Sequence, residues 1–273
     1  MKLFSAYRHW RPTPLVRGSI LLTLVAPLAL AVRPDLWPWI LAAVVVDHLV
    51  MTFAGLWPSC AWLGPNWASL PPDSAARGEI AITLDDGPDP AVTPAVLDLL
   101  DCHGVKATFF CIGEKARRYP DLCREIADRG HAVENHSMRH WHNFALLSAG
   151  GYFAELEAAQ QTLASITGIR PAFFRAPAGF RNLFLDAALN RLGLRLASWT
   201  RRGFDTRERN PQAVLARLLD GLEGGDILLL HDGNAARTAQ DKPVILEVLP
   251  PLLDAIAAAK LRPVTRREAF KKG

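Results

Sequence analysis

The chain contains few cysteines and no large excess of positive or negative charge. Each of these two features excludes a class of protein. The four cysteines, Cys60, Cys102, Cys111 and Cys123, are too few for a disulfide scaffold and form no C-x-x-C pair of the kind found in zinc ribbons. No self-similarity with a period of roughly 20–50 residues is present, which excludes solenoids and propellers. Half of the 273 residues are hydrophobic and 21% are charged, a composition that excludes intrinsic disorder.

A basic stripe is also absent. The formal net charge is +4; residues 1–78 carry six Lys or Arg against three Asp or Glu, and the remaining residues carry 25 against 24. The main body of the chain is therefore close to neutral and offers no surface that would track phosphates along a nucleic acid. We expect no nucleic-acid partner.

Two long apolar runs stand beside the N-terminal positive charge. Four Lys or Arg precede Gly18–Val32, which carries no charge, and the second run, Leu36–Trp57, has Asp47 as its only formal charge. The second run is long enough to cross a bilayer of ~30 Å, whereas the first reaches ~22 Å. Residues 1–60 are therefore predicted to hold a membrane helical hairpin that contacts lipid through residues 15–57.

Other interpretations of these runs remain open from the sequence. Ala29-Leu30-Ala31 fits the cleavage site of a secretory signal, and a soluble fold could bury both helices. Asp47 and His48 are two neighbouring ionisable residues inside the second run. They could have a function within the membrane, or Asp47 could simply lie at a helix-packing face or at the membrane interface.

The distribution of Lys and Arg predicts the side of the membrane. These residues tend to stay in the cytoplasm when they lie near the ends of apolar segments, which places the N-terminus inside. If both runs cross the cell (inner) membrane, the rest of the chain returns to the cytoplasmic side; if one crosses, it faces outside. Two spans and the cytoplasmic side are favoured.

Strands and helices are predicted to alternate after a proline- and glycine-rich linker, residues 61–78, in which no regular element is expected. The alternation is typical of a parallel sheet flanked by helices, and about seven or eight repeats favour an α/β barrel. The predicted strands are Ile80–Thr83, Ala107–Ile112, His131–Glu134, Ala172–Phe174, Leu194–Ser198 and Ile227–Leu230, and the main predicted helices are Thr93–Cys102, Asp121–Arg129, Ser148–Thr167, Leu183–Leu192, Pro211–Leu222 and Pro243–Ala259.

Polar residues recur after these strands, at the rim of a barrel where active sites are built. Asp85 and Asp86 are neighbours at a strand end, where side chains point to opposite faces, so one carboxylate could bind a metal ion while the other holds a proton or a water. On a helix, His136 and His140 would share one face and, with one Asp, form a site suited to zinc or another first-row divalent ion. An Asp-rich turn and a His-rich surface loop are the alternatives.

Arg175 and His231 follow two further strands. The Arg175 guanidinium could hold a carboxylate and keep it ionised, and His231 suits acid–base chemistry near neutral pH. Each residue alone also fits a strand end without chemical function. The four features together, in this order, are hard to obtain by chance.

These motifs resemble those of the polysaccharide deacetylases, carbohydrate esterase family 4. Thr83–Pro88 is similar to the family's T-F-D-D-G-P, His136–His140 to H-[ST]-x-x-H, Arg175–Pro177 to R-x-P and Leu229–His231 to the final L-x-H. The resemblance covers residues 79–270 and implies an irregular (β/α)7 barrel, so we expect a catalytic domain over residues 79–273.

The resemblance also implies a role for each matched residue. One divalent ion, zinc or alternatively Co²⁺, Ni²⁺ or Mn²⁺, is implied as cofactor. The implied roles are general base for Asp85, metal ligands for Asp86, His136 and His140, base orientation for Arg175, general acid for His231, and oxyanion or substrate binding for Pro177, Ala178, Trp199 and Leu229. Arg202, which departs from the family pattern, is predicted to bind substrate as well.

The chain departs from the family pattern at two places. Ala178 stands where the family often has Tyr, which keeps the backbone N–H but removes an aromatic wall. In the family's W-x-x-D-x-x-D-W motif, Arg202 replaces the first Asp and Thr206 the last Trp, while Asp205 remains and is predicted to bond to Arg175 or His231. Arg202 adds a cation, which suits an anionic substrate such as a phosphate-bearing, lipid-linked sugar.

The predicted function is metal-dependent removal of an N-acyl group, with N-acetyl first, from an amino sugar in a glycan or glycoconjugate at the membrane. One alternative is deformylation or deacetylation of a polyprenyl-phosphate-linked sugar. From another class, the domain could be a catalytically silent glycan-binding module, but all six implied catalytic and metal positions are filled, which argues against it.

Overall fold

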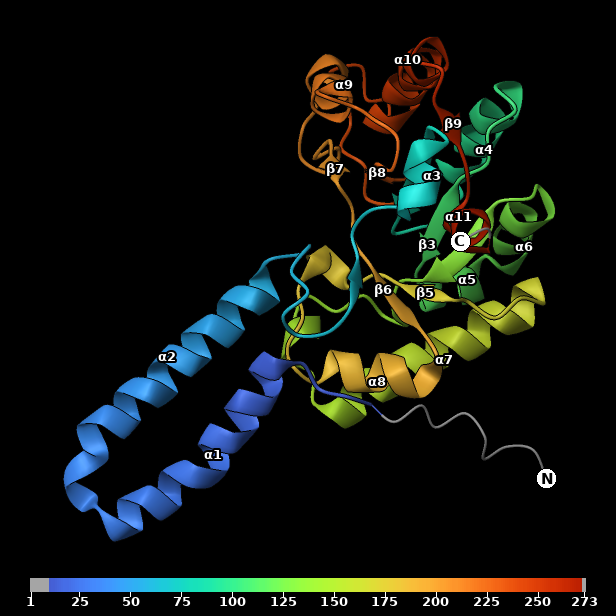
Figure 1. Ribbon diagram of the computed structural model, residues 1–273. Coiled ribbons are helices and arrows are strands. Elements are labelled where there is room, and N and C mark those ends of the chain that lie inside the picture. Colours follow the sequence, from blue (N-terminus) through green and yellow to red (C-terminus); the bar gives the residue numbers. More distant parts are fainter. Residues whose placement is uncertain (1–9, 272–273) are drawn as a thin grey trace.

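One parallel sheet organises the computed structural model, which describes residues 10–271 (Figure 1). Its strand order is β1-β6-β5-β4-β3-β2-β8-β7, and β9 pairs with the start of β2. Within the described residues β1 and β7 have no ladder with each other, so the expected α/β barrel is present but open. The strands are β1 Asn66–Trp67, β2 Glu79–Asp85, β3 Thr108–Cys111, β4 Ala132–Asn135, β5 Phe173–Phe174, β6 Arg195–Ala197, β7 Arg201–Arg202, β8 Ile227–His231 and β9 Arg262–Pro263.

Helices cover the outside of the sheet and bury its central strands. Every residue of β2 is buried, and the main apolar core lies where β2, β3 and β8 meet the helices around them. The helices after the hairpin are α3 Pro72–Ala76, α4 Thr93–Cys102, α5 Gly113–Arg118, α6 Pro120–Asp128, α7 Ala149–Thr167, α8 Leu185–Leu192, α9 Pro211–Leu219, α10 Val244–Ala258 and α11 Arg266–Lys271.

Local sequence signals place several of these helices as expected. The Ser148 hydroxyl accepts a hydrogen bond from the Gly151 N–H at the start of α7, and Gly168 ends that helix in the left-handed region at φ 73°. The Asn210 side chain accepts from the N–H groups of Gln212 and Ala213, and Pro at the first position begins α9.

Two apolar helices, α1 (Pro14–Val32) and α2 (Trp37–Leu56), form a hairpin that projects away from the sheet (Figure 1). In the most apolar 18-residue stretch of each helix, only 6% and 11% of the residues are buried. This excludes the interpretation of the two helices as core helices of a soluble fold. Both are long and apolar enough to cross a membrane, and a signal sequence meets the same criteria. The Ser19 hydroxyl donates to Asp47 Oδ2 across 2.8 Å, so Asp47 lies on the face between the two helices.

The prediction that residues 61–78 contain no helix or strand is wrong. Asn66 and Trp67 form β1, which pairs with Leu196 and Ala197, and Pro72 begins the short helix α3. Proline is compatible with the first turn of a helix, because the N–H it lacks has no intrahelical partner there. The domain boundaries at residues 60 and 79 stay predictions.

Candidate active site

A cavity of about 270 Å³ lies at the carboxyl ends of the strands. Arg175, Pro177 and Asp205 are buried and do not line it. The other predicted site residues do: Asp85, Asp86, His136, His140, Ala178, Trp199, Arg202, Leu229 and His231. Residues more than 140 positions apart in the chain therefore line the same cavity.

Asp86, His136 and His140 converge on one point. Asp86 Oδ1 lies 3.3 Å from His136 Nε2 and 3.1 Å from His140 Nε2. This oxygen is buried and accepts no hydrogen bond within the described residues. Among residues 10–271, these three form the one group of His, Cys, Asp or Glu whose ligand atoms lie close enough to hold a metal ion.

The hydrogen bonding and burial of the two histidines suit them to bind a metal ion. His136 Nδ1 lies 2.8 Å from the carbonyl oxygen of Arg175, which can only accept, so Nδ1 carries the proton and Nε2 presents its lone pair to Asp86. Burial, followed by the nearby charge of His136, lowers the pKa of His140 to about 4. Burial alone would raise the pKa of Asp86, but protonation of His136 would favour the carboxylate, and this interaction holds the pKa of Asp86 below the ordinary value. A carboxylate with two neutral imidazoles fits a divalent first-row ion.

The histidines do not lie on a helix, contrary to the expectation from their spacing. His136–His140 is a loop after β4, in which Ser137 and His140 have left-handed φ values of 64° and 53°. Asn135 Oδ1 accepts from the Ser137 N–H at 2.9 Å, and the Ser137 hydroxyl accepts from the His140 N–H at 2.9 Å. These side-chain bonds replace helical hydrogen bonds and fold the loop so that both rings face Asp86.

Asp85 is held by a buried arginine. Arg175 Nη1 donates to Asp85 Oδ1 across 2.7 Å and to the Thr83 hydroxyl across 2.8 Å, and Nη2 donates to the Ser198 carbonyl at 3.0 Å. The guanidinium also stacks over the Phe110 ring, 4.2 Å from its centroid. Burial lowers the pKa of Arg175, while the charge of Asp85 acts in the opposite direction. Asp85 is thereby fixed in orientation, with Oδ2 3.9 Å from His136 Nε2.

Asp205 is paired with His231 rather than with Arg175. His231 Nδ1 lies 2.8 Å from Asp205 Oδ1, and the His231 backbone N–H donates to Oδ2 across 2.7 Å. Burial would lower the pKa of His231, but the charge of Asp205 and this hydrogen bond raise it above the ordinary value. The arrangement fixes the tautomer and favours the protonated ring.

The loop after β5 brings Ala178 and Gly179 to the cavity. Pro177–Gly179 forms a 3-10 turn in which Ala178 has a φ of 55°, and both Ala178 and Gly179 line the cavity. A Cβ at Gly179 would lie 2.7 Å from the Trp199 ring and 2.7 Å from Pro58, so only glycine fits between them. Pro58 belongs to the segment directly after the apolar hairpin.

Four residues at the site were missed by sequence reasoning. Lys115 Nζ donates to the Asp86 carbonyl across 2.7 Å, and Asn234 Nδ2 donates to Asp86 Oδ2 across 3.1 Å. His142 and Arg207 line the cavity. Asn234 follows His231 by three positions, so the same strand-end argument could have found it, whereas Lys115 carries no signal of its own.

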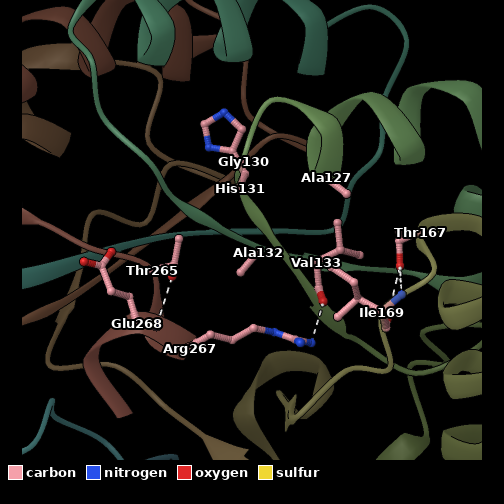
Figure 2. Close-up of a pocket in the computed structure, with 10 residues that line it drawn as sticks. All are labelled: Ala127, Gly130, His131, Ala132, Val133, Thr167, Ile169, Thr265, Arg267 and Glu268. Carbon is pink, nitrogen blue, oxygen red and sulfur yellow. Dashed lines mark hydrogen bonds between the residues drawn. The ribbon is translucent and has the colours of Figure 1, made fainter. Parts of the chain in front are cut away.

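A second cavity, of about 240 Å³, lies at the opposite end of β4 (Figure 2). It is lined in part by Ala132, Val133 and Arg267, whose guanidinium donates to the Val133 carbonyl. Its one imidazole, His131, accepts the Ala107 N–H at 3.1 Å, and burial lowers the pKa of His131 to about 4. This cavity contains no part of the Asp–His–His group.

Comparisons with known proteins agree with the motifs. A family model described as polysaccharide deacetylase matches residues 73–197. A chitooligosaccharide deacetylase from Azorhizobium caulinodans is 37% identical over 160 residues, 58% of this chain and 75% of that protein. A peptidoglycan-N-acetylglucosamine deacetylase from Bacillus cereus is 33% identical over 178 residues, 63% of this chain and 81% of that protein.

A solved structure extends the likeness to three dimensions. The family 4 carbohydrate esterase from Streptomyces lividans, in complex with acetate, matches with a TM-score of 0.62 and 29% identity over 68% of this chain and 91% of that one. The family resemblance, the fold class and the hydrolase class expected from the sequence are thus confirmed.

Proposed function

The chain belongs to the polysaccharide deacetylase family, carbohydrate esterase family 4, and we propose that it hydrolyses the N-acyl group, N-acetyl first, of an amino sugar. The convergence of Asp86, His136 and His140 beside an oriented Asp85 is the observation that carries this proposal. The chitooligosaccharide and peptidoglycan deacetylases named above support the same chemistry.

The side chains divide the hydrolysis between them. A divalent ion held by Asp86, His136 and His140, zinc first and Co²⁺, Ni²⁺ or Mn²⁺ as alternatives, would polarise the acyl carbonyl and lower the pKa of water. Asp85, held in place by Arg175, takes a proton from the attacking water. The Ala178 N–H donates to the oxygen that becomes negative when the carbonyl is attacked.

His231 completes the reaction. Its Nε2–H protonates the sugar nitrogen while the C–N bond breaks, so the products are acetate and the free amine. Asp205 holds His231 in the required tautomer. Trp199 and Leu229 form the apolar part of the cavity wall against which the sugar lies.

Acetate release tests this proposal. Purified full-length protein should release acetate from N-acetylated chitooligosaccharides, lose this activity on treatment with a chelator, and regain it with zinc. Retention of the glycan without acetate release, by protein that contains its metal ion, would instead identify a silent glycan-binding module.

The same proposal places the enzyme at the cell (inner) membrane. Residues 15–57 contact lipid, the two helices cross the bilayer, and the barrel faces the cytoplasm; the exposed apolar surface of the hairpin and the N-terminal positive charge support this arrangement. Reporter fusions after Trp57 and at the C-terminus test it. Fluorescence of a cytoplasm-only reporter supports two spans, and alkaline phosphatase activity at those points contradicts them.

A polyprenyl-phosphate-linked amino sugar, deacetylated or deformylated, is the second candidate substrate. The contact between Gly179 at the cavity and Pro58 at the base of the hairpin favours it, because a sugar carried on a membrane lipid would reach a cavity at that place. Faster turnover of a lipid-linked sugar than of a soluble chitooligosaccharide would select this substrate.

A further inference from the structure

Two arginines in the wall of the catalytic cavity have no acidic partner. Arg202 ends β7, and Arg207 follows in the next loop; both line the cavity together with Asp86 and His231. Within the described residues neither guanidinium takes part in a hydrogen bond or an ion pair, and Arg202 Nε is buried without any partner. The neighbouring Arg201, by contrast, pairs with Asp226 at 2.5 Å.

The acidic side chains nearby are engaged elsewhere. Asp205 binds His231, and Glu208 lies 3.1 Å from Arg217. Asp85 is bound to Arg175. Within the described residues Arg202 and Arg207 therefore form no ion pair, and Arg202 has only the longer-range attraction of Asp205, Asp85 and Asp86.

The packing of Arg202 holds its charge in place. The guanidinium carbon lies 4.9 Å from the centroid of the Phe204 ring and 5.5 Å from that of Trp199. Burial lowers the pKa of Arg202 below its ordinary value; the charges of Asp205, Asp85 and Asp86 oppose this shift, and the like charge of Arg207 adds to it. A half-buried cation next to a second cation would be stabilised by an anion that contacts both. The aromatic faces supply only part of this compensation.

We propose that Arg202 and Arg207 form an anion subsite that binds a phosphoryl group of the amino-sugar substrate. This inference rests on the proposed N-deacylation and names its substrate class. Two guanidinium groups present several N–H donors to one phosphoryl group, a match that a neutral glycan cannot use. The phosphoryl group belongs either to a soluble sugar phosphate or to the phosphate head of a lipid-linked sugar.

Paired substrates test the subsite. Metal-loaded full-length protein is assayed for acetate release from N-acetylglucosamine 1-phosphate and from the neutral disaccharide N,N′-diacetylchitobiose. The wild type should prefer the phosphorylated sugar by about 10- to 100-fold in kcat/KM, the range expected for charge-assisted hydrogen bonds. The preference should decrease as salt is added.

Matched variants assign the preference to these residues. R202Q and R207Q should each lower the preference for the phosphorylated sugar about tenfold, measured as the ratio of kcat/KM for the phosphorylated sugar to kcat/KM for the neutral one. R209Q removes one positive charge from the same loop, outside the cavity, where Arg209 binds the Arg237 carbonyl; it should keep the full preference. A polyprenyl diphosphate sugar as a third substrate distinguishes the two sources of phosphate.

The possible failures are distinguishable. Equal turnover of charged and neutral sugars by the wild type, or a preference that survives in the R202Q/R207Q double variant, overturns the anion subsite while the deacetylase function stands. No acetate release from any of the three substrates overturns the proposed function itself.

Discussion

The backbone N–H of Arg181 donates to the carbonyl oxygen of Gly55 across 3.1 Å, and this bond joins the last turn of the apolar hairpin to the loop that carries Ala178. The buried Arg181 guanidinium donates to the carbonyls of Pro58 and Cys60 as well. The end of the hairpin therefore forms part of the framework of the candidate oxyanion site.

A glycine pair in the hairpin tests this coupling. A Cβ at Gly55 would lie 2.2 Å from the Arg181 carbonyl oxygen, so Gly55→Ala should displace the loop and lower kcat about tenfold or more, since oxyanion donors contribute about 10²–10³-fold. Gly18 has nothing within 4 Å, and Gly18→Ala should keep full activity. Equal kcat values for the two variants, at equal metal content, would mean that the hairpin does not position the loop.

The metal set predicts three variants with the same phenotype. Asp86→Ala, His136→Ala and His140→Ala should each lose bound metal and turnover together, because each removes one of three ligands. Metal content is measured by elemental analysis of the purified protein. His142→Ala changes an imidazole of the same cavity outside this set and should retain the metal ion. Full activity of any of the first three variants, without added excess metal, would contradict the assignment.

The two neighbouring carboxylates should behave differently. Asp85→Asn is expected to keep the metal ion and lose about 10²–10⁴-fold in kcat, the usual contribution of a general base. Asp86→Asn should lose the metal ion. If the metal content follows the reverse pattern, the roles of the two residues are exchanged.

The pairing of His231 with Asp205 predicts a shift in the pH–rate profile. A general acid must be protonated, so the rate falls as pH rises through its pKa, which Asp205 raises. Asp205→Asn removes that charge and should move the alkaline limb to lower pH. In Glu208→Gln, which changes an acid bound to Arg217, the limb should stay in place. If the alkaline limb of the pH–rate profile does not shift in Asp205→Asn, His231 is not the group whose deprotonation produces that limb.

Local patterns in the sequence determined much of this protein. The helix Thr93–Cys102 was predicted with its observed bounds, and Asn210 with Pro211 marked the start of α9, because caps and prolines act on their immediate neighbours. The order of the Asp, His, Arg and His motifs was sufficient to identify the family, since each follows its own strand.

Only the tertiary structure decided how these pieces meet. His136 and His140 face Asp86 from a loop rather than from a helix, because Asn135 and Ser137 compete locally for the backbone. Lys115 and the contact between Pro58 and Gly179 carry no signal in the sequence. Strand pairing and packing between distant segments set such contacts, and no local propensity encodes which surface a side chain will meet.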